Sequence, residues 1–396
     1  MITKRIFITL FALFAFVGLN AQNYDFSVAN NGKAIYYKVI DTANVKVCSG
    51  NINCYFGKVE IPDTVSSNGV RYNVVEIDNY AFALSDSLTE VVLPISVKKI
   101  GNFAFQSCTL LTNIMLTDSV KAIGKGAFSQ CSSLSTIRIP AYLTSVSQMC
   151  FKQCASLNNL YIGNIIEYVD TAAFENCTGL VNLTIDSSVH AIRSNAFKYC
   201  GALAELRLPN RIDTIEEYAF FGSGAIRNAY LGQSDSSKLE YIGRNAFGYC
   251  TRLISTTVYR QMPPKMYDNT FTGVENKHVL HVPCGRKPYY DTAAYWKDLN
   301  TAYKTIVEDC GVGLDDEPDM VSVSLYPNPA KTHFIIEGKN IKNITICNIL
   351  GKEVFRRNGS LSERHEISTY GFKTGFYLVK VGFDGGKCKT LKLQIQ

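Results

Sequence analysis

The fold is decided by the stretch Ile100-Gly101-Asn102-Phe103-Ala104-Phe105-Gln106-Ser107-Cys108-Thr109-Leu110-Leu111, which returns in close copies along the chain. Its Phe105 belongs to a series that we call the marker phenylalanines. Seven of them are 23 residues apart and two more follow after 27 and 24 residues: Phe82, Phe105, Phe128, Phe151, Phe174, Phe197, Phe220, Phe247 and Phe271. A repeat of this length is a single supersecondary unit that must stack on its neighbours to bury its apolar face. The sequence therefore predicts a solenoid.

Other apolar positions keep the same register. An aliphatic residue precedes each marker up to Phe247 by five positions, and a Leu or Ile follows by six. Aliphatic pairs such as Ile137 and Ile139 follow most of the markers by nine and eleven positions and alternate with mostly polar residues. This alternation is typical of a strand with one face inward. Each coil is thus expected to add a strand and about five or six large apolar side chains to one continuous core.

The repeated pattern Ile-Gly-x-x-Ala-Phe-x-x-Cys-x-x-Leu, followed in some coils by Ile139-Pro140 or Leu208-Pro209, resembles the BspA-type leucine-rich repeats of bacterial surface proteins. The resemblance runs from about Ile77 to Phe271. It implies a mainly β, right-handed leucine-rich repeat solenoid. Departures are Cys150 in place of Ala, Ser85 and Ser223 in place of Cys, and an insertion from Gln233 to Ser237 that should form a bulging loop.

Three glycines stand where the chain leaves the aliphatic position and turns toward the marker. They are Gly101, Gly124 and Gly243. We expect this position to need the freedom in φ that glycine has.

The flanking segments indicate further parts of the chain. Residues 22–76 contain several strand-like runs and are expected to form a β-rich N-terminal cap over the open end of the solenoid at residues 77–262. Residues 263–310 look like a C-terminal closing segment that contains the single tryptophan, Trp296. An indole buries a large area, so capping the core is favoured over a ligand platform. Residues 311–320 read as an acidic linker.

The tail at residues 321–396 has several short strand-like runs, which predict a small β-sandwich. Its motifs resemble the C-terminal sorting domain of the type IX secretion system of Bacteroidetes. The residues that carry this resemblance are Tyr326, Pro327, Asn328, Pro329, Gly351, Gly375 and Tyr377. The resemblance implies passage across the outer membrane, with the secretion machinery as a partner, and removal of the tail near the linker.

The first residues read as a signal peptide at residues 1–21, because Lys4 and Arg5 precede an apolar run from Ile6 to Leu19 and a small residue, Ala21, offers a cleavage site. The run is short for a bilayer span, and we expect no transmembrane segment in the mature chain. The protein is therefore expected to be exported, to the outer-membrane surface or the extracellular space.

The total charge of +6 includes +2 from residues 1–21 and +7 from residues 321–396, so residues 22–320 carry −3. A basic footprint is the first requirement of a nucleic-acid-binding protein, and the repeats lack one. Nucleic acid is therefore not an expected partner.

Thirteen cysteines enter a compartment where disulfides can form. Six of them follow a marker by three residues and should form a ladder of buried free thiols, because their side chains point the same way. Spacing cannot fix the pairing of the others. The pairs we expect are Cys48 with Cys54 and Cys284 with Cys310.

No residue constellation for catalysis stands out, and we expect neither an enzyme nor a cofactor or metal site. His278 and His281 have a spacing that could bind a metal, but in a strand they would point to opposite faces. Ordinary strand histidines are the favoured interpretation. A triad assembled from distant residues would be invisible to this reasoning.

The outward face of the predicted strands is the candidate binding surface, because Arg and Tyr among small polar residues are typical of recognition surfaces. A merely solvated sheet face is the competing interpretation. The candidate residues are Met115, Arg138, Asn159, Tyr161, Asn182, Glu205, Arg207 and Tyr230. The resemblance implies adhesion to an extracellular protein of a host or neighbouring cell, and a glycan-binding or structural surface module is the alternative.

Overall fold

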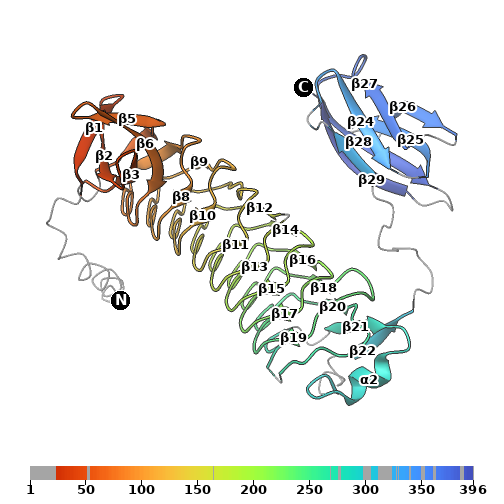
Figure 1. The fold of residues 1–396 in the computed structure, drawn as a ribbon. Coiled ribbons are helices and arrows are strands. Elements are labelled where there is room, and N and C mark those ends of the chain that lie inside the picture. The colour runs from red at the N-terminus through yellow and green to blue at the C-terminus, as the bar shows by residue number, and fades with distance from the viewer. Residues whose placement is uncertain are drawn as a thin grey trace, which may run out of the picture. The chain divides into compact units, whose positions relative to one another are not determined.

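The computed structural model describes residues 24–50, 54–163, 165–267, 269–274, 278–297, 305–310, 323–326, 328, 330–338, 340–348, 353–359, 363–383 and 388–395. The chain divides into two compact units, Met1–Val312 and Gly313–Gln396. The expected signal peptide and linker lie outside the described residues. The first unit consists mainly of β-strands and is built from stacked coils of the chain (Figure 1).

The first unit begins with a mixed β-sheet, in which some strands pair antiparallel and others in parallel. Its strands are β1 (Phe26–Asn30), β2 (Lys33–Val39), β3 (Asn44–Cys48), β5 (Thr64–Ser67) and β6 (Val70–Ile77). β6 pairs in parallel with β3 on one side and with the first short solenoid strand, β8 (Lys99–Ile100), on the other. The solenoid therefore continues this sheet directly.

Most coils then add two parallel strands. The first are two-residue strands at the aliphatic position before the marker: β8, β10 (Ala122–Ile123), β11 (Ser145–Val146), β13 (Tyr168–Val169), β15 (Ala191–Ile192), β17 (Thr214–Ile215) and β19 (Tyr241–Ile242). The paired neighbours in this series up to β17 are offset by 23 residues, as with Val146 and Val169, and the ladder is interrupted between β10 and β11. The repeat length of the sequence is thus the register of the sheet.

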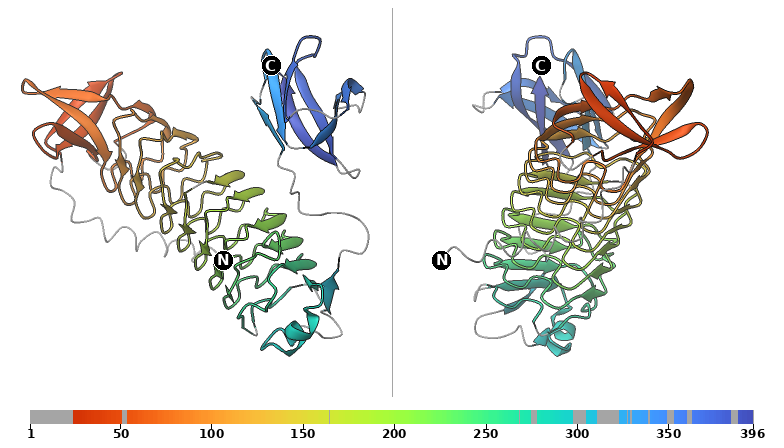
Figure 2. Two further views of the ribbon diagram at one scale, coloured as in Figure 1. Left: turned by 45° about the vertical axis from the view of Figure 1, so that its right-hand side comes forward. Right: turned by 90° about the vertical axis from the view of Figure 1, so that its left-hand side faces the viewer.

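The second strands form what we call the strand column: β4 (Gly57–Glu60), β7 (Leu88–Val92), β9 (Asn113–Met115), β12 (Asn159–Ile162), β14 (Asn182–Ile185), β16 (Glu205–Leu208), β18 (Asn228–Leu231), β20 (Ser255–Val258), β21 (Val279–Pro283) and β22 (Thr305–Asp309). Figure 2 shows these strands following one another along one side of the coils. The ladder is interrupted between β9 and β12, where an isolated bridge from Thr136 to Asn159 replaces a strand. It is interrupted again between β14 and β16.

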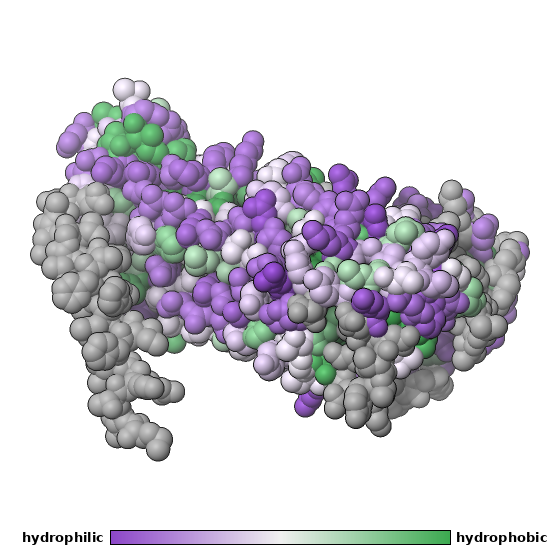
Figure 3. Space-filling model, turned by 90° about the horizontal axis from the view of Figure 1, so that it is seen from below, coloured by the Kyte–Doolittle hydropathy of each residue, from purple (hydrophilic) through white to green (hydrophobic). Residues whose placement is uncertain are grey.

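The marker phenylalanines form a continuous internal stack, which we call the marker column. Consecutive rings from Phe82 to Phe271 are 4.8–5.5 Å apart between centroids and lie within 3–9° of parallel. All of these rings are buried. Tyr55 extends the stack beyond Phe82, with a centroid separation of 4.4 Å. Hydrophilic residues dominate the side of the molecule that Figure 3 shows, as expected when the apolar stack lies inside.

The cysteine ladder is confirmed, and it has a bonding role. Each thiol is free and donates a hydrogen bond of 3.0–3.4 Å to the carbonyl oxygen of the marker in the preceding coil. The six are Cys108, Cys131, Cys154, Cys177, Cys200 and Cys250. In one of the two coils with serine in place of cysteine, Ser223 Oγ makes the same bond to Phe197 O at 2.9 Å. The thiols therefore join neighbouring coils without covalent bonds.

Contrary to our expectation from the sequence, the three glycines before the markers are not needed for a positive φ. Gly101, Gly124 and Gly243 do not have a positive φ. A Cβ added to Gly101 would instead lie 2.5 Å from the backbone nitrogen of Asn79 in the preceding coil, and Gly124 and Gly243 meet the preceding coil in the same way. Glycine is needed here because two backbones approach closely.

Left-handed backbone occurs two residues before and two residues after the markers. It is carried mostly by residues other than glycine, such as Phe103 (φ 55°) and Ser107 (φ 59°). At these positions and at the marker itself, the N–H donates to a carbonyl of the next coil, as in Phe103 N to Lys125 O (2.8 Å) and Phe105 N to Ala127 O (2.7 Å). The turns around the marker are thereby bonded coil to coil almost like a sheet.

The insertion from Gln233 to Ser237 forms the expected loop. Asn210 holds it, since its Oδ1 accepts from the backbone of Gln233 at 2.6 Å and its Nδ2 donates to Ser234 Oγ at 2.8 Å. The extra residues therefore leave the coil without disturbing the stack.

The far end of the solenoid is covered by β21, β22 and α2 (Lys287–Thr292). Trp296 is 1% exposed, donates from Nε1 to Pro264 O at 2.6 Å, and packs edge-on against Tyr290. The interpretation of this tryptophan as part of the core covering is confirmed.

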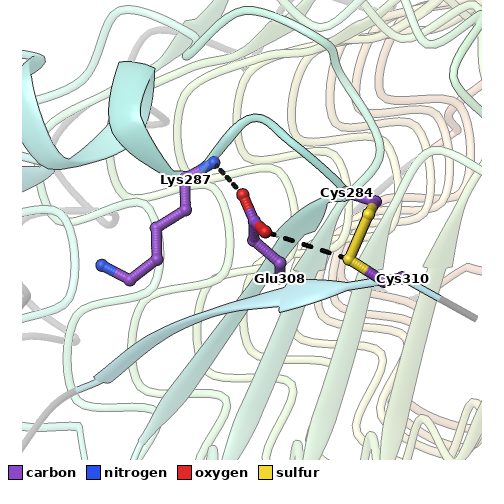
Figure 4. Close-up of a disulfide and its surroundings, with 4 residues drawn as sticks. All are labelled: Cys284, Lys287, Glu308 and Cys310. Atoms are coloured by element: carbon purple, nitrogen blue, oxygen red, sulfur yellow. Dashed lines mark hydrogen bonds between the residues drawn. A yellow bond between two sulfur atoms is a disulfide. The ribbon is translucent and has the colours of Figure 1, made fainter. Parts of the chain in front are cut away.

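One of the two expected disulfides is present. Cys284 and Cys310, which directly follow β21 and β22, are bonded (Figure 4). The expected bridge between Cys48 and Cys54 is wrong, because both are free thiols. Cys48 is buried at the end of β3, where its carbonyl oxygen accepts a bond from the Tyr55 hydroxyl at 2.8 Å, whereas Cys54 is only half-buried.

The second unit is a β-sandwich, as predicted. One sheet contains β23 (Val323–Tyr326), β24 (His333–Gly338) and β27 (Arg364–Ser368), and the other contains β26 (Glu353–Asn358), β25 (Ile341–Asn348), β28 (Gly375–Phe383) and β29 (Cys388–Ile395). Residues of both sheets, such as Phe334, Ile336, Ile344 and Val379, share one core.

Candidate functional site

The strand column brings the candidate binding residues onto one surface, because they occupy outward positions of neighbouring coils. Met115, Arg138, Tyr161, Asn159, Asn182, Glu205 and Arg207 are exposed. Met115 is the most open of the large side chains among them, at 71% exposure. Tyr230 is only half-buried rather than exposed, since Arg207 lies over it. Whether this surface binds a ligand stays a prediction.

Arg138 is held by an acid that the sequence did not single out. Its Nη2 donates to Asp118 Oδ2 at 2.8 Å, and the other carboxylate oxygen accepts from the backbone of Ala141 at 2.8 Å. The bond from Arg138 lowers the pKa of Asp118. The guanidinium is thus fixed in direction by the preceding coil, although an exposed pair of this kind adds little stability.

Tyr161 is fixed in the same manner. Its hydroxyl donates to Asp186 Oδ2 at 2.9 Å, and its ring lies close to Gly163, where an added Cβ would meet the ring at 2.7 Å. Partial burial, and then the bond to Asp186, raise the pKa of Tyr161. Glycine at position 163 therefore makes room for the ring.

A short amide ladder runs between these groups and the next coils. Asn182 Nδ2 donates to Asn159 Oδ1 at 2.7 Å across the β12 and β14 pair. This bond links two exposed amides of neighbouring coils on the candidate face.

Further along the column, Arg207 contacts two neighbours. Its Nε donates to Glu205 Oε1 at 2.5 Å, and its guanidinium carbon is 4.0 Å from the centroid of the Tyr230 ring. Such a cation–π contact favours a fixed arginine over a ring. Tyr259 lies close to Arg207 and Tyr230 and is half-buried. The repeat pattern did not reveal this neighbour, because Tyr259 follows the end of the strand β20.

A hollow of about 560 Å³ opens where the ladder between β9 and β12 is interrupted. Its polar lining comes from the candidate face and its neighbours: Thr136, Arg138, Asn159, Tyr161, Asn182 and Thr184. The hollow could not be predicted from the residue pattern, because Ile137 and Ile139 keep the alternation of a regular strand.

The residues of the sorting motif lie in the second unit. Tyr326 ends β23 and its hydroxyl bonds to the carboxylate of Glu337, while Asn328 Oδ1 accepts from Gln394 N at 2.9 Å in β29. Gly375 begins β28 with φ 149°, and Tyr377 is buried with its hydroxyl on Lys373 O. Pro327, Pro329 and Gly351 lie outside the described residues.

Among the described residues, side chains that could bind a metal gather at one place, where the ligand atoms of Cys284, Cys310 and Glu308 lie within 4.8 Å of one another. Figure 4 shows the two sulfur atoms bonded to each other beside Glu308, which accepts a bond from the backbone of Lys287 at 2.9 Å. A disulfide offers no thiolate, and thiolates are the form of cysteine that binds metals. This group is therefore a structural closure.

The two histidines at metal-like spacing are separated by the fold. His278 is buried and its Nε2 lies 3.0 Å from Thr256 Oγ1, whereas His281 is half-exposed. The fold does not bring the two side chains together, and their interpretation as ordinary strand histidines stays a prediction. Among the described residues, no helix is both long and apolar enough to span a bilayer.

Comparison with known proteins identifies both units. The family described as the BspA type leucine rich repeat region matches residues 52–181 and 168–284 in six copies. The secretion system C-terminal sorting domain matches residues 324–396. No match was found among curated proteins.

Several solved structures are similar to the chain. A leucine rich cell surface protein of Faecalibacterium prausnitzii is 19% identical, with 74% of this chain and 97% of that chain covered and a TM-score of 0.41. The leucine rich repeat protein of T. pallidum is 26% identical, with 55% and 87% covered and a TM-score of 0.42. A leucine-rich repeat protein of Bacteroides ovatus is 19% identical, with 72% and 100% covered and a TM-score of 0.33.

The repeat match spans more than half of the chain, and the tail match places the protein among exported proteins, surface-attached or extracellular. The chain thus belongs to the BspA-type leucine-rich repeat proteins and ends in a C-terminal sorting domain of the type IX secretion system.

Proposed function

We propose that this protein is a non-enzymatic adhesion module, which binds a protein of a host or neighbouring cell through the strand column. Residues 22–310 would form the exported binding part, with residues 22–76 and 263–310 covering the two ends of the repeats at residues 77–262. The domain at residues 321–396 serves the secretion machinery.

The observation that carries the proposal is the composition and order of the strand face. Exposed Met115, Arg138, Tyr161 and Arg207 follow one another along the coils, and three of them are held in place by neighbours. Met, Tyr and Arg are enriched at the centres of protein interfaces, and side chains that are already ordered lose little freedom on binding. Leucine-rich repeat solenoids present extended surfaces of this kind to partners.

The test uses the full chain on an array of extracellular matrix proteins and on a glycan array. Changing Arg138, Tyr161, Arg207 and Tyr230 together to Ala should abolish binding to the protein that the wild type retains. A control variant changes two tyrosines and two cations elsewhere on the solenoid, Tyr199, Tyr249, Lys121 and Arg252, to Ala and should bind as the wild type does. Binding that survives the first variant would contradict the assignment of the face, and retention on the glycan array alone would favour the glycan-binding alternative.

A further inference from the structure

The floor of the hollow on the strand column is aliphatic. It is lined by Ile137, Ile139, Pro140, Leu143, Leu160 and Ile166. Five of these six are buried elements of the solenoid core, and Ile139 is half-buried. The intervening coil runs through residues 136–140 without the pairing of a regular strand, apart from the bridge from Thr136 to Asn159, and the hollow is lined by this segment and by β12.

The polar groups around the hollow already have partners within the chain. Arg138 pairs with Asp118, and the Tyr161 hydroxyl donates to Asp186. Asn182 donates to Asn159. A charged ligand would have to compete with these internal bonds, whereas an uncharged apolar group would leave all of them in place.

We propose that the hollow receives one uncharged apolar side chain, aliphatic or aromatic, from the partner protein. This inference rests on the proposed function and names the chemistry of its central contact. A volume of about 560 Å³ accommodates a large side chain together with the adjoining backbone of the partner. Thr136 and Thr184 at the edge offer hydroxyl groups to that backbone. Anchors of this type, inserted into pockets near the centre of an interface, carry most of the binding energy in protein complexes.

A saccharide fits the hollow less well than an apolar side chain. The aliphatic floor offers no hydrogen-bond partner to the saccharide hydroxyl groups that would face it, and each hydroxyl group left unpaired opposes binding. Met115, one coil before the hollow, adds an exposed flexible thioether at the same face, which suits apolar contact.

The test is a selection of peptides from a random display library on the full chain, with Ala141→Leu as the blocking variant. Ala141 lines the hollow and is exposed, so a larger side chain fills the space without entering the core. Its backbone bond to Asp118 does not depend on the side chain. Ala155→Leu is the matched control, because it makes the same change at an exposed position that does not line the hollow.

The enriched peptides should share one Leu, Ile, Met or Phe position. Changing that residue to Ala, or changing Ala141 to Leu in the protein, should weaken binding about tenfold or more, while Ala155→Leu leaves it unchanged. Thr184→Leu, which narrows the hollow from the next coils, should act as Ala141→Leu does. Circular dichroism establishes that each variant is folded.

Three results would overturn the inference. The first is that peptides are enriched no better on the wild type than on the Ala141→Leu variant. The second is that the enriched peptides share an acidic residue instead of an apolar one. The third is that an oligosaccharide binds the wild type and Ala141→Leu abolishes its binding. If instead peptide binding is lost when Arg207 and Tyr230 become Ala but is unaffected by Ala141→Leu, the hollow is not the anchor site although the strand face still binds protein. Failure of the inference is thereby separated from failure of the proposed function.

Discussion

The marker column and the strand column run through the same coils but differ in regularity. In the marker column, every coil from Phe82 to Phe271 repeats the same stacked ring, and six coils repeat the same thiol bond. In the strand column the ladder breaks twice, and the outward residue changes from Met115 to Arg138 to Tyr161. The comparison teaches that the rings and thiols of a coil can hold the stack together while the outward strand positions are free to vary.

The first prediction tests the marker column at high pH. The buried thiols that bond to the carbonyl oxygens of the markers should stay protonated in the folded chain when thiols of the unfolded chain already ionise. Burial raises the pKa of Cys108, Cys177 and Cys250 to about 12. In the unfolded chain a thiol ionises near pH 8.5, so the unfolded state loses its protons first as the pH rises. The free energy of unfolding should therefore fall by about 1.4 kcal/mol per pH unit for each such thiol between those values. Urea unfolding at pH 7 to 10.5 measures the slope.

The control for this prediction is a variant with Ser at positions 108, 177 and 250. Serine keeps the hydrogen bond, as Ser223 does, but does not ionise in this range. Above about pH 8.5, the free energy of unfolding of this variant should fall less steeply with pH than that of the wild type. The difference should equal the contribution of three thiols. A slope equal to that of the wild type would mean that the thiols do not govern alkaline unfolding.

The second prediction compares one residue from each column of the same coil. Phe151→Ala removes a ring from the middle of the stack and should cost about 3–5 kcal/mol, since the cavity cannot collapse between two fixed coils. Tyr161→Ala, ten residues on, should cost less than about 1 kcal/mol because the side chain is exposed. Urea unfolding of both variants measures the two costs, and similar values would contradict the separation of roles.

The third prediction concerns the end of the strand column, where a covalent bond takes the place of continued stacking. Changing Cys284 and Cys310 to Ser should lower the free energy of unfolding by about 2–4 kcal/mol, because the bond closes a loop of 26 residues. Amide hydrogen exchange should quicken in β22 and α2 and remain slow in β12 and β14. Cys154→Ser serves as the control, and uniform quickening along the solenoid would contradict a local closure.

The 23-residue spacing was enough to predict the solenoid, its buried rings and its free thiols, because these depend on a contact that every coil makes with the next. The glycine positions were found but explained wrongly. Glycine is required because the backbone of Gly101 lies close to that of Asn79 in the preceding coil, and not because of its φ angle. This contact between coils cannot be seen in the spacing of the sequence. The left-handed residues beside the markers were not foreseen, because Phe103 and Ser107 share no side-chain chemistry that would announce such a backbone.

The candidate face could be named from outward strand positions, but not its internal bonds. Asp118 is 20 residues from Arg138 and Asp186 is 25 residues from Tyr161, and both lie after strands, where the repeat pattern carries no constraint. The hollow depends on a strand that fails to form although Ile137 and Ile139 keep strand alternation. Likewise, spacing alone could not tell the disulfide at Cys284 from the absent one at Cys48.

The parallel pairing at the offset of 23 residues that most coils share has an evolutionary consequence. A duplication or deletion of one whole repeat in the gene would lengthen or shorten the protein by a single step of about 4.8 Å and would leave every remaining neighbour contact intact. The length of the solenoid is therefore a quantity that selection can adjust in nearly equal steps without a new fold.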